Sequence, residues 1–132
     1  MKRTIVVLAA LGIVALGAVP ASAHMQDYQG AKKAVLFQNT GSEIVWPIRW
    51  QCSNGESASV TVRIRQGTQS TSISSGLTCS GSPSVAFVDF DGTGFHYGLA
   101  RGSVRWEFSD NNVFTNSRDI QIVQCGDVWW CV

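Results

Sequence analysis

Two neighbouring runs of alternating apolar and polar residues constrain the fold of this chain more than any other feature. Residues 44–52 and residues 57–66 both place their apolar side chains on even positions, with a polar Ser53-Asn54-Gly55 break between them. Asn and Gly tolerate the positive φ of a tight turn. A period of two on both sides of a turn is typical of two half-buried antiparallel strands. The stretch from Ile44 to Gln66 therefore predicts a β-hairpin with one buried face. That face consists of Ile44, Trp46, Ile48, Trp50, Cys52, Ala58, Val60, Val62 and Ile64.

Further strands are expected on both sides of this hairpin. Pro47 has no backbone N–H to donate to a neighbouring strand, which suggests an edge position or a bulge. Residues 24–30 are polar and read as a loose entry segment, while the Ser-, Thr- and Gly-rich residues 67–82 predict a short edge strand near 71–74 and a crossing connection. The remaining expected strands are residues 32–38, 84–90 and 99–109, and a last strand or strand pair formed by residues 113–115 and 118–123.

About seven short strands with turn signals between them, and no apolar helical stripe after residue 23, predict the all-β class. The expected architecture is an antiparallel two-sheet β-sandwich of immunoglobulin or fibronectin-III type. A small closed barrel is the alternative.

The first 23 residues have the pattern of an export signal. Lys2 and Arg3 precede an apolar run, and Ala21-Ser22-Ala23 forms an A-x-A cleavage site. We expect residues 1–23 to be removed and residues 24–132 to form one secreted domain without a membrane span, rather than a protein that keeps an anchor helix. Removal of Lys2 and Arg3 brings the formal charge near −1, which argues against nucleic acid as a partner.

Four cysteines lie after the expected cleavage site: Cys52, Cys79, Cys125 and Cys131. An even number in a short exported chain indicates two disulfides. Of the three pairings, Cys52–Cys79 with Cys125–Cys131 is favoured, because the second pair then closes a short local loop. Zinc is the rival use, but the chain has no C-x-x-C and His24 and His96 stand at no ligand-like spacing.

A set of spaced residues resembles the small secreted β-sandwich proteins of actinobacteria whose function is unknown. The likeness covers residues 44–123 and rests on Cys52-x-x-Gly55, a strand ending in Gln66, Gly76, Cys79-x-Gly81, Phe95-x-x-Gly98-x-Ala100 and Arg118-x-Ile120. It implies a fold and a disulfide but no catalytic residue. A more distant likeness, in architecture alone, is to the chromoprotein antibiotic carriers related to neocarzinostatin.

Catalytic and metal-binding patterns are weak. Asp89, Asp91 and Thr93 begin like a calcium loop, but Ala100 occupies the position of the closing carboxylate, so a turn is the preferred interpretation. His96 is the one plausible imidazole base, and no Gly-x-Ser-x-Gly elbow occurs. We therefore expect no enzymatic activity and no cofactor.

Aromatic and basic residues supply the candidate binding positions. Trp129 and Trp130 are adjacent, so on a strand they would point oppositely and one would be exposed, unless their loop plugs the end of the sandwich. A second aromatic group consists of Phe95 and Tyr97. The outward-facing Arg49, Arg63 and Arg65 are expected to form a basic stripe, which is either a solvated sheet face, the preferred interpretation, or a surface for an acidic partner.

These patterns predict a monomeric, extracellular, non-enzymatic binding module for a protein or a cell-surface glycan. Two alternatives stay open: a small inhibitor of an extracellular hydrolase that inserts Asp127, Val128, Trp129 and Trp130, and a carrier of a small apolar ligand. A hydrolase using Asp89, Asp91 or His96 ranks last.

Overall fold

The computed structural model describes residues 5–9, 24–38 and 41–131, and strands make up most of this part. The all-β class is therefore confirmed. The predicted export signal lies outside the described residues except for residues 5–9, and its cleavage site lies wholly outside them. The elements are β1 (Ile5–Ala9), β2 (Met25–Gly30), β3 (Lys33–Phe37), β4 (Glu43–Cys52), β5 (Ser57–Gln66), β6 (Gln69–Thr78), β7 (Ser84–Asp91), β8 (Gly98–Phe108), β9 (Val113–Val123) and the 3-10 turn η2 (Cys125–Asp127).

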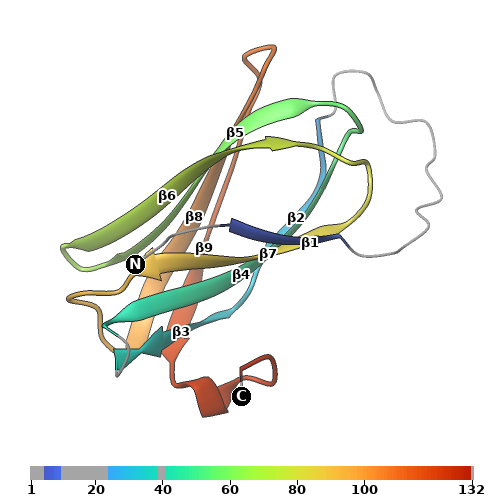
Figure 1. Ribbon diagram of the computed structural model, residues 1–132. Helices are drawn as coiled ribbons and strands as arrows, with labels where there is room; N and C mark the ends of the chain where they lie inside the picture. The colour runs from blue at the N-terminus through green and yellow to red at the C-terminus, as the bar shows by residue number, and fades with distance from the viewer. Residues whose placement is uncertain (1–4, 10–23, 39–40, 132) are drawn as a thin grey trace.

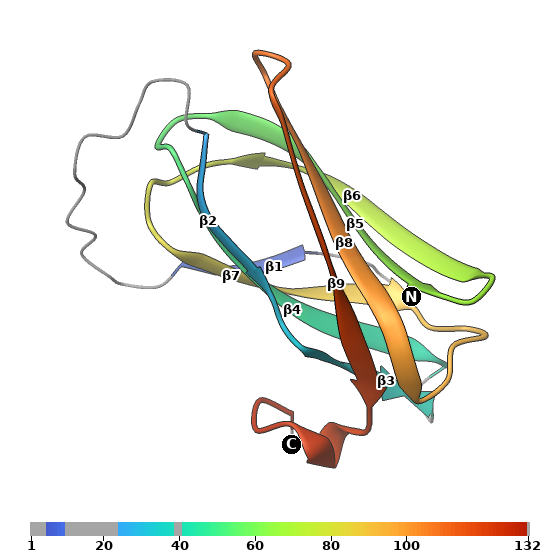
Figure 2. The same cartoon turned by 180° about the vertical axis from the view of Figure 1, so that it is seen from behind.

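The strands form one continuous sheet in the order β1-β7-β4-β3-β9-β8-β5-β6, with β2 also paired to β4. All pairs are antiparallel except β3 with β9. The sheet curls into a half-barrel (Figures 1 and 2), so the expected division into two separate sheets is not seen. The physical reason is β3, which pairs with β4 on one side and β9 on the other and joins the two halves. Twist accumulated along the long strands then folds the sheet over its own concave face.

The concave face of the curled sheet holds the core. The predicted β-hairpin is wrong, because β4 pairs with β2, β3 and β7 whereas β5 pairs with β6 and β8. The even-numbered residues of 44–52 and 58–64 are buried as predicted, and so are their neighbours on β8. Val60 lies opposite Trp106 in the β5–β8 ladder, and the Trp106 ring lies 5.4 Å from that of Trp50 on β4. Burial of aromatic rings of this size contributes a large share of the hydrophobic stabilisation.

Trp46 fills the space between two glycines of the sheet. Its indole Nε1 donates a hydrogen bond of 2.8 Å to the carbonyl oxygen of Ala31. A Cβ atom added at Gly30 or at Gly102 would lie 2.5 Å from an indole carbon. These two positions on β2 and β8 therefore have to lack a side chain for the indole to fit.

Pro47 lies within β4 and not on an edge strand. Its carbonyl oxygen accepts a hydrogen bond from Ala31 N, so its nitrogen faces the break between β2 and β3, which both pair with β4. The missing N–H falls where the neighbouring strand is interrupted, which explains how proline is tolerated inside the sheet.

Two polar segments contain more strand than the sequence pattern predicted. Residues 24–30 were expected to be loose, but Met25–Gly30 pairs with β4, and His24 is buried. The expected short edge strand at 71–74 extends over Gln69–Thr78 and pairs with β5 along its whole length. Both are held by backbone ladders, and the Thr61 and Ser74 hydroxyls add a contact of 2.9 Å across the β5–β6 pair.

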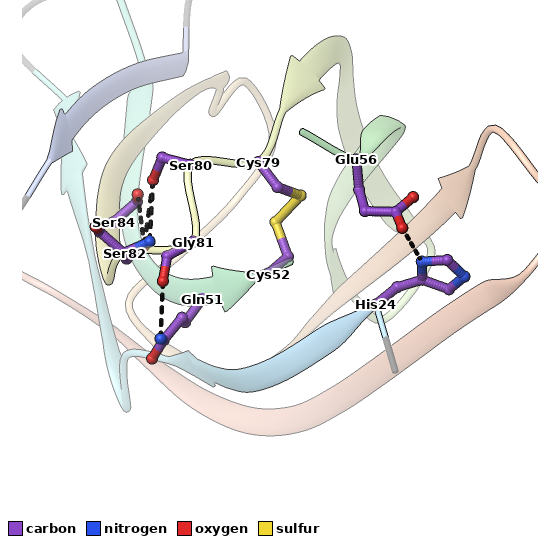
Figure 3. The surroundings of a disulfide bond; sticks show 9 residues. All are labelled: His24, Gln51, Cys52, Glu56, Cys79, Ser80, Gly81, Ser82 and Ser84. Atoms are coloured by element: carbon purple, nitrogen blue, oxygen red, sulfur yellow. Dashed lines mark hydrogen bonds and ion pairs between the residues drawn. A yellow bond between two sulfur atoms is a disulfide. The ribbon is translucent and has the colours of Figure 1, made fainter. Parts of the chain in front are cut away.

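Both predicted disulfides, Cys52–Cys79 and Cys125–Cys131, are present. Two disulfides indicate an oxidising compartment. Figure 3 shows Cys52–Cys79 beside the start of β2, where His24 meets Glu56. Within the ranges that the structure describes, no helix has the length and apolar character to cross a membrane.

The carboxylate of Asp110 is held in its charged form, which predicts a pH-dependent stability. Hydrogen bonds from the backbone and side chain of Asn112, then that from His24, lower the pKa of Asp110. A lowered folded-state pKa stabilises the protein above the ordinary carboxyl value of about 3.9, and this contribution is lost as pH falls through the lowered value. Asp110→Asn should reduce the melting temperature slightly at neutral pH and leave it unchanged near pH 2. Thermal melts across this range check the prediction, and an undiminished difference at the acidic end would contradict it.

Candidate functional site

The chain beyond β9 folds back over the outer, convex face of the sheet. Figure 1 shows this segment leaving β9 and turning beneath β3. The disulfide Cys125–Cys131 closes it into a ring, and Lys33 Nζ lies 3.5 Å from the carbonyl oxygen of Asp127. The Trp130 ring lies 5.6 Å from the ring of Phe87 on β7, at an interplanar angle of 55°. Trp130 therefore anchors the C-terminal loop, residues 125–131, to the outer face.

A groove of about 570 Å³ lies between this loop and the outer face. The β4–β7 register places Pro47 opposite Phe87 and Arg49 opposite Val85. Pro47, Val85 and Phe87 form the floor of the groove. The C-terminal loop supplies the wall. Trp129 belongs to this wall and is 92% exposed. The complete lining is Gln29, Gly30, Ala31, Lys32, Lys33, Pro47, Ile48, Arg49, Val85, Phe87, Asp127, Val128, Trp129 and Trp130.

The groove has an apolar floor and a predominantly basic rim. Lys32, Lys33 and Arg49 carry three positive charges, against the single carboxylate of Asp127. Arg49 is held in place because its Nη2 donates a hydrogen bond of 2.5 Å to Gln29 Oε1. A fully exposed indole beside fixed cations can stack on a flat apolar surface and attract negative charge at the same time.

The structure gathers three of the predicted binding residues in this groove. Trp129 and Trp130 both line it, one exposed and one packed on the sheet, and Arg49 contributes from β4. The expectation for Phe95 as an exposed anchor is wrong, because its side chain is 4% exposed and belongs to the core. Tyr97 is 44% exposed but does not line the groove.

Sequence reasoning missed the floor of the groove. Val85 and Phe87 belong to residues 84–90, which were expected only to form a strand although the run is apolar on both faces. A strand that is apolar on both faces also has apolar side chains on the convex side of the sheet, and another segment has to pack on them. Here that segment is the C-terminal loop. The second apolar face of residues 84–90 is thus the signal that could have located the groove.

The predicted basic stripe is divided between two surfaces. Arg63 and Arg65 lie on β5, away from Arg49, and join Arg101 and Arg105 of β8 on the outer face. Arg101 pairs with Asp119 at 2.8 Å and Arg105 with Glu107 at 2.9 Å. Two of these four charges are therefore balanced. The hollows beside them are lined mainly by Arg, Ser, Thr and Asn side chains, which is typical of a solvated sheet face.

The residues that resemble the start of a calcium loop, Asp89, Asp91 and Thr93, end a strand and begin a hydrogen-bonded turn. Asp91 Oδ1 accepts hydrogen bonds from Thr93 N at 3.0 Å and from Thr93 Oγ1 at 2.7 Å, so this carboxylate stabilises the loop. Asp89 lies on the same outward face of β7, two residues earlier. Throughout the part of the chain that is described, no three side chains of His, Cys, Asp or Glu are grouped to hold a metal ion.

No protein-family model matches the chain, and no curated protein matches its sequence.

Proposed function

We propose that this protein is a secreted, non-enzymatic binding module that holds its ligand in the groove beneath the C-terminal loop. The observation that carries the proposal is the position of Trp129, a 92% exposed indole at a groove of about 570 Å³. A groove of this volume is within the range of small-ligand sites. Exposing a tryptophan forgoes the stabilisation that its burial would give, so its position on a disulfide-closed loop favours a role in recognition.

The chemistry of the groove fits a cell-surface glycan that carries acidic groups. The apolar face of a sugar ring stacks on an exposed indole, and Lys32, Lys33 and Arg49 would attract carboxylate, phosphate or sulfate substituents. Secretion is part of the proposal. It is supported by the export-signal pattern of residues 1–23 and by the two disulfides.

Substitution of Trp129 by alanine tests the proposal. Binding of the exported protein to neutral and uronic-acid oligosaccharides can be followed by tryptophan fluorescence and calorimetry. We expect Trp129→Ala to weaken binding about tenfold or more, the usual effect of removing a central aromatic anchor. Arg49→Gln should weaken binding of the acidic oligosaccharides only.

Leu99→Ala is the matched control, because Leu99 is another large exposed apolar side chain, 61% exposed, and does not line the groove. It should leave affinity unchanged. Equal loss in Leu99→Ala and Trp129→Ala, or no binding of any oligosaccharide, would refute the glycan site. Inhibition of a secreted protease or amylase by the intact protein, abolished by Trp129→Ala, would instead establish the inhibitor alternative.

The carrier alternative has less support. The cavity beside Trp106, lined also by Ile48, Trp50, Val60 and Leu77, measures about 120 Å³. That is well below the size of typical small-molecule sites, which begin at about 300 Å³. Phe95 is buried in the core, and Tyr97 does not line this cavity.

A further inference from the structure

His24 lies at the start of β2, at the opposite end of that strand from the groove. Its side chain is 6% exposed, and its ring stacks on Phe108 with centroids 4.6 Å apart. Nδ1 lies 3.2 Å from Glu56 Oε1, as Figure 3 shows, and Nε2 lies 2.7 Å from Asp110 Oδ2. A buried imidazole is thus placed between two carboxylates from separate turns.

The two ring nitrogens have different roles. A carboxylate can only accept, so the short contact with Asp110 places a hydrogen on Nε2. Asn112 Nδ2 lies 3.0 Å from His24 Nε2 and 2.7 Å from Asp110 Oδ2. We assign its hydrogen bond to the carboxylate, because an ionised Asp110 has no hydrogen to donate to Nε2 and the two would otherwise repel at 2.7 Å. Nδ1 is buried and makes no hydrogen bond, because the contact with Glu56 has the distance of an ion pair but not hydrogen-bond geometry. In the neutral ring, the Nδ1 lone pair therefore faces a carboxylate oxygen.

The Nδ1 lone pair of His24 and the Glu56 carboxylate repel each other unless a positively charged group lies between them. The separation of 3.2 Å is close to that of two neighbouring ligands on one metal ion, about 3 Å for bonds of about 2.1 Å at right angles. A proton on Nδ1 is the other occupant that the geometry allows, and it is an outcome of the test below.

His24 is also the residue that directly follows the predicted Ala21-Ser22-Ala23 cleavage site. Cleavage there would give His24 a free α-amino group. The α-amine and the Nδ1 of one histidine close a six-membered chelate ring on a metal ion. The peptide nitrogen of the uncleaved precursor is a far weaker ligand. This main-chain ligand supplements His24 and Glu56, which as two side chains alone do not make a metal cluster.

We propose that the mature protein binds one divalent transition-metal ion, Cu²⁺ most strongly, through the His24 α-amine, His24 Nδ1 and the Glu56 carboxylate. Imidazole and amine nitrogens favour Cu²⁺ among the divalent first-row metals. Asp110 acts as a positioning residue, because it accepts from Nε2–H and fixes the ring with Nδ1 directed at Glu56. The site is independent of the glycan groove and rests on cleavage after Ala23.

The test uses protein exported with its own leader and purified from the medium. Intact mass establishes the amino terminus, and titration with Cu²⁺ is followed by calorimetry and electron paramagnetic resonance. We expect one equivalent to bind with two nitrogen ligands in the spectrum. His24→Gln should abolish this binding, and Asp110→Asn should weaken it about tenfold. His96→Gln, which replaces the other histidine of the chain, should have no effect.

A variant with six Gly and Ser residues before His24 keeps every side chain and the fold but displaces the amine. It should lose stoichiometric binding, and this variant remains informative even if His24→Gln is poorly folded. Cleavage at another bond, Cu²⁺ binding that survives the extension, or a Cu²⁺-free protein with a protonated His24 would each overturn the proposal.

Discussion

Replacing Cys52 and Cys79 together by serine is expected to lower the free energy of unfolding by about 3–4 kcal/mol. The two residues are 27 positions apart, and a cross-link over this distance removes about 3.5 kcal/mol of chain entropy from the unfolded state. Both cysteines are almost fully buried, so the serine hydroxyls would also enter an apolar core. Urea denaturation followed by tryptophan fluorescence under non-reducing conditions measures the change.

The second disulfide provides the control. Cys125 and Cys131 are 6 positions apart and lie beyond the last strand, outside the buried core. Replacing this pair by serine should change the unfolding midpoint of the sheet little, but it should weaken the proposed glycan binding because Trp129 loses its fixed position. Equal destabilisation by the two double substitutions would contradict this division of roles.

Gly102→Ala is expected to lower the free energy of unfolding by about 1–3 kcal/mol. Inside a strand, alanine in place of glycine usually stabilises, by about 0.5–1 kcal/mol. Here the added Cβ would lie 2.5 Å from the Trp46 indole, which is 1% exposed and tied to Ala31 O by its Nε1. The rigid ring has no space into which it can withdraw, so overpacking outweighs the backbone gain.

Two further variants isolate this clash. Gly76→Ala on β6 introduces the same methyl group where nothing lies within 4 Å, and it should be neutral or slightly stabilising. In a Trp46→Phe background, the smaller ring should reduce the cost of Gly102→Ala, with a coupling of about 1 kcal/mol in a double-mutant cycle. Additive effects of the two substitutions would show that the indole does not determine the need for glycine.

The strands predicted best are those whose alternation reports one buried face. Residues 44–52 and 57–66 carry that signal throughout and match β4 and β5 almost to the residue. The polar runs of β2 and β6 carry no such signal, since they are held by ladders to strands that have it. For the same reason His24 was expected to lie in a loose entry segment. Its burial depends on Phe108, Glu56 and Asp110, which are remote in sequence.

The candidate groove was likewise only partly predictable, because it is formed by segments that are far apart in the sequence. The exposure of one of the two adjacent tryptophans was predicted, because neighbours on a strand point to opposite faces, but the sequence did not indicate which of them it would be. The floor of the groove was not predicted, because nothing in the sequence states that β7 and the C-terminal loop meet. The basic stripe was misplaced since Arg49 and Arg63 belong to strands that are not paired in the sheet, despite being joined by a turn.

By itself, the sequence determined the all-β class, the buried faces of residues 44–52 and 57–66, and the pairing of all four cysteines. These depend on local periodicity and on short loop closure, which neighbouring residues encode. Only the tertiary structure decided that one sheet curls into a half-barrel, that Trp46 requires two glycines, and that Trp130 seats the loop which leaves Trp129 exposed. Each of these depends on contacts between residues far apart in the chain, whose geometry exists only once the strands have paired.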